Sequence, residues 1–273
     1  MKRDIKKTSY AAGAIVSLLL FYIGISFVYP DVSRLAKYTP KKSAMMEYRE
    51  HQYEAEGKKI KLRQVWVPFS RISPYMAKAV LIAEDDKFWH HEGFDFEGME
   101  KALEKDIEKG KFKAGGSTIS QQLAKNLFLS PSRNPIRKIK EAILTWRMEH
   151  ALKKRRILEL YLNFAEWGDG IFGIEAAARH YYGIPASALN AEQAAKLASV
   201  LPNPHKYSPV NPSRYVQNRS RIIYNIMVRR GIAVPEYEEV MQPGQADGQP
   251  PSGEDAPQTS GKSQPFMGVS TIR

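Results

Sequence analysis

Cysteine is absent from the 273 residues of the sequence, which excludes disulfide bonds and thiolate metal sites and fits any redox compartment. No internal repeat of useful length is apparent either. Acidic residues are too few to balance the basic ones, since 29 Asp and Glu face 41 Lys and Arg, for a formal net charge of +12. Such a surplus indicates an anionic partner, with nucleic acid, acidic lipid headgroups and a phosphorylated substrate as candidates.

Charged residues are also missing from the stretch Ala11–Tyr29, which as a helix is long enough to cross the roughly 30 Å hydrocarbon layer of a membrane. The preceding residues 1–10 are basic and are expected to stay in the cytoplasm, which places the chain after Pro30 on the outer side. A cleaved signal peptide is the alternative. The apolar region of a signal peptide is usually shorter than Ala11–Tyr29, and no small-x-small cleavage site follows Ala11–Tyr29. We therefore predict a retained single-pass transmembrane anchor.

The rest of the chain divides by composition into three parts. Residues 30–64 form a charged juxtamembrane segment that is expected to lead away from the bilayer. Residues 65–241 carry apolar side chains at helical spacing between short loops, which predicts one mostly α-helical domain. Residues 242–273 are rich in Gly, Pro, Ser and Gln and almost lack large apolar side chains, so this tail is expected to be disordered.

Capping residues predict where several helices of the domain begin and end. Expected helix starts lie at Ser73-Pro74, at Ser117-Thr118, at Pro135, and at Asn190 with Gln193 three residues later. The last predicted helix covers Ser213–Arg230 and is ended by Gly231.

Two adjacent carboxylates, Glu84 and Asp85, are the first candidates for chemistry. They end an apolar predicted helix and precede an aromatic, histidine and glycine cluster. A carboxylate against an apolar surface has its charged form disfavoured, which suits it to general acid or base catalysis. The pair alone does not decide the matter, because most Glu-Asp pairs cap helices or face water.

A second candidate is the polar run that follows Gly115-Gly116. Backbone N–H groups at a helix start after glycines can bind an anion, and the helix that begins near Ser117 continues with side chains suited to sugar or phosphate oxygens. These side chains are Gln121, Gln122, Lys125 and Asn126. A plain glycine turn with a capped helix explains the glycines and Ser117 but gives no reason for this polar run.

The third candidate is the basic stretch Arg133–Arg156. Glu141 lies within it, four residues after Arg137 and three after Lys138, so all three side chains share one helical face. A solvated helix with an internal salt bridge is the ordinary interpretation of such a run. The functional interpretation is a pyrophosphate cradle, because Lys and Arg stabilise the negative charge of a departing phosphoryl group.

Four blocks in this order resemble glycosyltransferase family 51, the peptidoglycan glycosyltransferases, and specifically its short monofunctional transglycosylases. The resemblance covers about Val65 to Met227. The first block contains Glu84-Asp85, Phe88, His91, Gly93 and Asp95, and the second contains Gly116-Ser117-Thr118-Ile119, Gln121-Gln122 and Lys125-Asn126. The third contains Arg137-Lys138 and Lys140-Glu141, and the fourth runs from Lys154 through Ile157-Leu158-Glu159 to Tyr161-Leu162-Asn163.

The resemblance implies a mostly α-helical, lysozyme-like glycosyltransferase domain behind the membrane anchor. It implies that the enzyme joins a glycan held as its undecaprenyl diphosphate to the 4-hydroxyl of lipid II, the lipid-linked disaccharide-peptide, through a β-1,4 bond with inversion. Glu84 is then expected to be the general base, and Glu141 to position the donor or assist departure of the diphosphate. The substrate-binding residues expected from the resemblance are Ser117, Gln121, Gln122, Lys125, Asn126, Arg133, Arg137 and Lys140.

The resemblance also bears on activities, ions and partners. No Ser-x-x-Lys motif occurs, so the transpeptidase activity of the larger bifunctional relatives is not expected. No cofactor is required, and any Mg²⁺ or Mn²⁺ is expected on the substrate diphosphate, because adjacent carboxylates alone are weak evidence for a protein metal site. Expected partners are lipid II, the undecaprenyl-diphosphate glycan, the inner membrane and other proteins of cell-wall synthesis and division.

Three alternatives remain at the level of the sequence. A lytic transglycosylase or muramidase would also be lysozyme-like, but it needs no diphosphate cradle, so the basic stretch argues against it. A membrane-tethered nucleic-acid-binding protein would have its basic surface on the wrong side of the membrane, and no nucleic-acid-binding motif is recognised. A catalytically inert scaffold for wall synthesis is excluded only by an assay.

Overall fold

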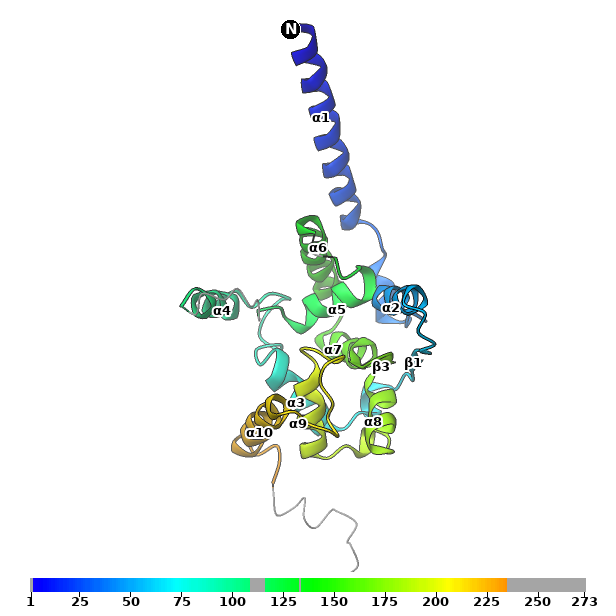
Figure 1. Ribbon diagram of the computed structural model, residues 1–273. Helices are drawn as coiled ribbons and strands as arrows, with labels where there is room; N and C mark the ends of the chain where they lie inside the picture. The colour runs from blue at the N-terminus through cyan, green and yellow to red at the C-terminus, as the bar shows by residue number, and fades with distance from the viewer. Residues whose placement is uncertain (1, 109–115, 133, 235–273) are drawn as a thin grey trace, which may run out of the picture.

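The computed structural model describes residues 2–108, 116–132 and 134–234, and helices dominate it (Figure 1). The mostly α-helical fold predicted from the sequence is thereby confirmed. The α-helices are α1 (Lys2–Gly24), α2 (Ala44–Ala55), α3 (Pro74–Glu84), α4 (Phe96–Glu108), α5 (Ile119–Phe128), α6 (Pro135–Ala151), α7 (Lys154–Phe164), α8 (Ile174–Tyr182), α9 (Ala191–Val200) and α10 (Arg214–Arg229). Short 3-10 turns cover Ile25–Phe27, Val32–Ala36, Phe69–Arg71 and Ala186–Ala188.

A small sheet of three strands lies beside the helices. In the order β1–β3–β2, β1 (Arg63–Gln64) pairs parallel with β3 (Ile171–Phe172), and β2 (Glu166–Gly168) pairs antiparallel with β3. The turn between β2 and β3 uses Gly170 at a φ of +71°, a backbone conformation that side chains disfavour. The sheet therefore joins the segment before α3 to the hairpin after α7.

Most of the predicted helix starts are confirmed in detail. Thr118 and Asn190 are N-caps in capping boxes with the glutamines three residues later, and Pro135 occupies the first turn of α6. Ser73 is the N-cap residue of α3 and Pro74 lies in its first turn, as expected, but the Ser73 side chain makes no cap hydrogen bond. Its hydroxyl donates to the carbonyl of Leu189 at 2.6 Å instead of capping α3, so it fastens the start of α3 to the loop before α9.

The hydrophobic core centres on α7, whose apolar side chains are almost fully buried. Helix α5 packs against α6 and α7, while α3 packs against α9 and α10. Burial of apolar area is the main stabilising contribution in such an arrangement, at roughly 25 cal/mol per Å². The C-terminal end of α3 meets the N-terminal end of α5, where Asp85 accepts the backbone N–H of Ile119.

The compact body begins well before residue 65, where the composition had placed the start of the domain. Val32 and Leu35 are buried in the main core, and so are Met45 and Met46 of α2, which packs against α5. The charged side chains of this segment obscure its few apolar positions in the sequence. The predicted tail, residues 242–273, lies outside the described residues.

Helix α1 projects from the body next to α6 (Figure 1). The stretch Gly13–Ala36 contains an 18-residue window that is apolar enough to cross a membrane, with a mean hydropathy of 1.9, and almost all side chains of that window are exposed. Arg147 of α6 fixes the end of this segment by donating to the carbonyls of Ser26 at 3.0 Å and Val28 at 2.9 Å. The α-helix itself ends at Gly24, earlier than Tyr29, and a 3-10 turn follows.

Candidate active site

Glu84 is the last residue of α3, where an apolar helix packed on the core reaches the surface. Its side chain is only 12% exposed. It lines a pocket of about 210 Å³ together with Asp86, Asp95, Gly116 and Ser117. The carboxylate is therefore largely shielded by protein and yet reachable from a small polar pocket.

Two side chains from distant parts of the chain contact this carboxylate, and a third orients one of them. The amide of Gln122 donates to its Oε2 at 2.9 Å, and the hydroxyl of Tyr161 donates to the amide oxygen of Gln122 at 3.1 Å. On the other side, Arg219 of α10 donates to the Ala83 carbonyl at 2.9 Å and to Glu84 Oε1 at 3.3 Å. Because the amide oxygen of Gln122 accepts the hydrogen bond from the Tyr161 hydroxyl, the amide nitrogen of Gln122 must be the atom that faces Glu84.

The protonation of Glu84 reflects two opposing influences. Burial raises the pKa of the Glu84 carboxyl, while the hydrogen bond from Gln122 and the positive charge of Arg219 lower it in part. A carboxylate whose pKa is moved toward neutrality can accept a proton from a substrate hydroxyl more readily than an ordinary exposed one. The environment of Glu84 therefore suits a general base.

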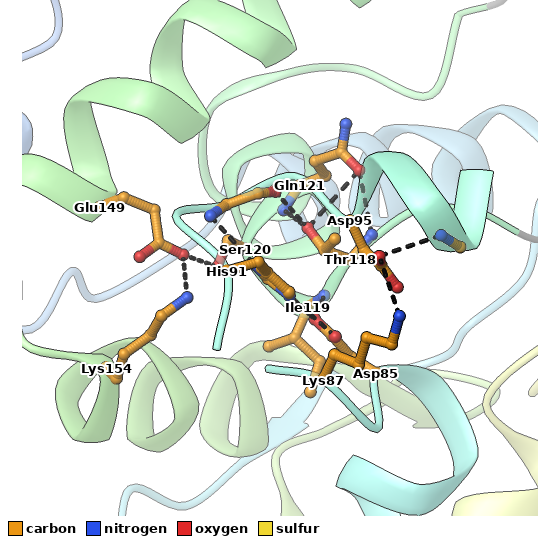
Figure 2. Close-up of polar contacts among 12 residues, drawn as sticks. Asp85, Lys87, His91, Asp95, Thr118, Ile119, Ser120, Gln121, Glu149 and Lys154 are labelled. Carbon is orange, nitrogen blue, oxygen red and sulfur yellow. Dashed lines mark hydrogen bonds and ion pairs between the residues drawn. The ribbon is translucent and has the colours of Figure 1, made fainter. Parts of the chain in front are cut away.

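Asp85, the neighbour of Glu84, has a structural role (Figure 2). It accepts the backbone N–H of Ile119 at 2.9 Å and contacts Nε2 of His91 at 2.9 Å. The N–H of Gly93 donates to Nδ1 of His91 at 3.0 Å, so Nε2 carries the proton that is donated to Asp85. Asp85 thereby binds the loop after α3 to the first turn of α5.

The start of α5 is built around Thr118. Its N–H donates to the side-chain oxygen of Gln121 at 3.0 Å, and its hydroxyl donates to the Gly93 carbonyl at 2.7 Å. Gln121 is 3% exposed, so its amide oxygen serves the helix cap, and its expected substrate role stays a prediction. Ser117 precedes the cap and lines the pocket at Glu84, as a substrate donor would.

A second buried carboxylate lies on α6. Glu141 is 2% exposed and pairs with Arg137 at 2.6 Å and with Lys138. Lys125 of α5 lies within reach of the charge of Glu141. Burial lowers the pKa of its ammonium, and the charges of Glu141 and Glu84 partly oppose that shift. Facing sides of α5 and α6 thus gather three cations around one buried carboxylate.

The remaining expected binding residues lie at different distances from this cluster. Lys140 points toward the anchor, with its Nζ 3.5 Å from the centre of the Tyr22 ring. Asn126 is half-buried on α5 beside Lys125. Arg133 lies outside the described residues.

The acidic residues after α3 do not converge on one point. Glu84 is held by Gln122, Asp85 by His91, and Asp86 by Arg230 at 2.5 Å. Among the residues that the structure describes, no group of three or more His, Asp or Glu side chains is arranged to hold a metal ion.

Two residues of the site were not singled out as functional by the sequence. Tyr161 stood in the fourth block without an assigned role; it is 1% exposed, and its hydroxyl orients Gln122. Arg219 lies in the last helix with no local pattern that marks it, because its partner is 135 residues away.

Comparisons with known proteins agree with this geometry. The transglycosylase family model matches residues 52–228. The biosynthetic peptidoglycan transglycosylase of Nitrosospira multiformis is 45% identical over 220 residues, which cover 79% of this chain and 96% of that protein. The protein of the same name from Dechloromonas aromatica is 49% identical over 184 residues, which cover 67% of this chain and 80% of that protein. The chain therefore belongs to the transglycosylase family, and it is a glycosyltransferase.

Proposed function

We propose that this chain polymerises the glycan of peptidoglycan, joining lipid II units to a growing strand held as its undecaprenyl diphosphate. The observation that carries the proposal is the shielded carboxylate of Glu84 next to a partly buried cluster of cations on α5 and α6. The similarity to biosynthetic peptidoglycan transglycosylases supports the substrate class.

In the proposed reaction, Glu84 removes the proton from the 4-hydroxyl of the acceptor sugar. The acceptor oxygen attacks the anomeric carbon of the donor, and the bond from that carbon to the diphosphate breaks as the new β-1,4 bond forms. One displacement of this kind inverts the anomeric centre. Glu84 keeps the proton, and the electron pair leaves with the diphosphate.

The cations on α5 and α6 have the complementary role. Negative charge grows on the diphosphate as it departs, and fixed positive charges stabilise that change most when they are partly removed from water. Lys125 and Arg137 are both partly buried, and Glu141 holds Arg137 in place. A charge cluster of this kind favours the transferase over a glycan-cleaving muramidase, which has no diphosphate to bind.

The remaining parts of the proposal follow from the sequence. A retained anchor would place the body on the outer face of the cytoplasmic membrane, where lipid II and other wall-synthesis and division proteins are the partners. The reaction requires no protein-bound metal, and any Mg²⁺ or Mn²⁺ would accompany the substrate diphosphate. Without a Ser-x-x-Lys motif we expect no transpeptidase activity, and we expect no binding of nucleic acid.

Exchange of Glu84 for glutamine tests the proposal. Glu84→Gln keeps the shape of the side chain and removes its basic oxygen, so polymerisation of purified lipid II should fall by about 10²–10⁴-fold. Glu192→Gln is the matched control, because Glu192 is an exposed glutamate on α9. Circular dichroism of both variants would check the fold. Turnover of Glu84→Gln at the rate of the control would remove Glu84 from the mechanism.

A further inference from the structure

A second pocket, of about 660 Å³, opens away from Glu84. Four segments line it: residues 59–63 leading into β1, the β2–β3 turn, the end of α8, and residues 204–208 in the connector before α10. It shares no lining residue with the pocket at Glu84. Figure 1 shows β1 and α8 on the side of the body opposite α4 and α10, and shows α8 farther than α6 from the end of α1 that meets the body. The position of the pocket therefore argues against a headgroup of the membrane that holds α1 as its ligand.

The charge of this pocket is strongly positive. Lys59, Lys61 and Arg63 line it from one side and Lys206 from another. Lys59, Lys61 and Arg63 are exposed and pair with no carboxylate within the described part of the chain. The acidic residue in the lining, Asp169, already contacts Tyr53 and His205. These cations are consequently available to an anionic ligand.

The frame of the pocket is fixed by a charged network. Asp169 accepts the hydroxyl proton of Tyr53 at 2.5 Å and contacts Nδ1 of His205 at 2.8 Å. Nε2 of His205 lies 3.1 Å from Glu166, which also pairs with Arg49 at 3.1 Å. The network holds the connector against the β2–β3 hairpin, so the pocket exists before a ligand arrives.

Two tyrosine rings in the lining are also fixed. The hydroxyl of Tyr181 donates to the Trp167 carbonyl at 3.2 Å. The ring of Tyr207 stacks on that of Tyr215, with centroids 4.6 Å apart and planes 16° apart. Rings that are held in this way offer contact area at little cost in conformational entropy. The pocket thus combines free cations with preformed aromatic surface.

We propose that this pocket binds the glycan strand after it has been formed, with the cations holding peptide carboxylates and the tyrosines contacting sugar rings. The proposal rests on the proposed function, since it takes the product of that reaction as the ligand. A strand with a carboxylate-bearing peptide on alternate sugars offers repeated negative charge beside extended apolar sugar faces. An acidic protein segment offers the charge without the rings, and the binding test separates the two ligands.

The test compares binding of soluble peptidoglycan strands, with and without their peptides, to the full chain in detergent. In the pocket variant Lys59→Gln/Lys61→Gln/Arg63→Gln, affinity for peptide-bearing strands should fall by about tenfold or more at low salt. The control Lys78→Gln/Arg214→Gln/Arg229→Gln removes the same charge from exposed positions that do not line the pocket and should stay within about twofold of the original chain. Equal affinity of the two variants, or binding of acidic peptides in preference to strands, would overturn the proposal.

A second measurement separates this proposal from the proposed function. With lipid II as substrate, the pocket variant should form the first glycosidic bond at the rate of the control but release shorter chains. Chains of unchanged length would contradict a role for the pocket in holding the strand. Failure of the original chain to form any bond would instead defeat the proposed function, while the binding of soluble strands would still test the pocket.

Discussion

At the scale of the residue, the chemistry of Glu84 depends on the groups that surround it. Burial disfavours its charged form, and Gln122 and Arg219 partly restore it. These contributions come from α5 and α10, so they can be altered one at a time without changing Glu84 itself. The quantity that such changes should shift is the pH at which the carboxyl of Glu84 loses its proton.

Arg219→Gln should move the acidic limb of the pH–rate profile to higher pH. The arginine lowers the pKa of the Glu84 carboxyl through its charge and its hydrogen bond, so its loss raises that pKa and the base is deprotonated only at higher pH. The profile of kcat/KM for lipid II is the measurement. Arg221→Gln, an exposed position two residues further along α10, is the control and should leave the limb in place. An unmoved limb in Arg219→Gln would show that Glu84 does not set it.

The sequence predicted the candidate base but not its setting. Glu84 and Asp85 stood together in one motif, and their division of labour became visible only when Asp85 was found to accept the Ile119 N–H and the His91 proton. Both contacts join segments that are far apart or lie in a loop, where periodicity carries no information. Arg219 was missed for the same reason.

At the scale of the element, the pairing of α5 with α6 produces the cation cluster. The predicted salt bridge on α6 is confirmed, since Arg137 and Lys138 both contact Glu141. The sequence could not show that Glu141 would be buried, because that depends on α5 packing over it. Helix caps were predicted more easily, since capping residues such as Thr118 and Asn190 act within a few positions.

Arg137→Ala should slow the chemical step as well as weaken donor binding. A charge-assisted hydrogen bond to the diphosphate strengthens as the leaving group gains charge, so its loss costs more in the transition state than in the bound state. Arg137→Lys should recover only part of the rate, because a point charge lacks the planar fork of arginine. Lys140→Ala should also weaken the reaction of the donor, although its ammonium contacts Tyr22 in this structure.

Single-turnover kinetics on a defined lipid-linked donor would measure these changes. Lys153→Ala removes an exposed cation before α7 and is the control. If Arg137 served only its salt bridge, Arg137→Ala would lower the free energy of unfolding by roughly 1–3 kcal/mol, because the buried carboxylate of Glu141 would keep only Lys138, and it would spare the chemistry. That outcome would show that the cations of α6 form an ordinary charged helix face without a role in the reaction.

The connector before α10 makes the stability of the fold sensitive to pH. Both ring nitrogens of His205 face carboxylates, those of Glu166 and Asp169, and the close contact with Glu166 is the main cause that raises the pKa of its imidazole. Because this pKa is raised in the folded state, the stabilisation is fully present below the ordinary histidine value and is lost as pH rises through the raised one.

His205→Gln should therefore lower the free energy of unfolding by about 0.5–1 kcal/mol at pH 6, after allowance for solvent screening, and by less at pH 9. Urea unfolding followed by tryptophan fluorescence at the two pH values is the measurement. His180→Gln is the control, since His180 is exposed and its ring meets Tyr181 instead of a carboxylate. A loss of stability that is equal at both pH values would contradict the ionic contact.

At the scale of the whole molecule, the juxtamembrane segment and the helical body form one unit. Segments before residue 65 contribute to the core, and the family match accordingly begins at residue 52. Composition had separated this region from the domain because its charged residues outnumber its apolar ones. The few apolar side chains that matter, such as Leu35 and Met46, are recognisable only through their burial.

The retained anchor can be tested because the chain has no cysteine. Arg147 binds the carbonyls of Ser26 and Val28, contacts that cleavage after Tyr29 would remove, so we predict that protein isolated from membranes keeps its original N-terminus. A single cysteine introduced by Lys41→Cys should react with a membrane-impermeant thiol reagent added outside the cytoplasmic membrane, while one introduced by Lys6→Cys should react only after lysis. N-terminal sequencing that starts after about Tyr29 would show a cleaved signal peptide, and the reverse labelling pattern would place the active site on the wrong side for the proposed substrate.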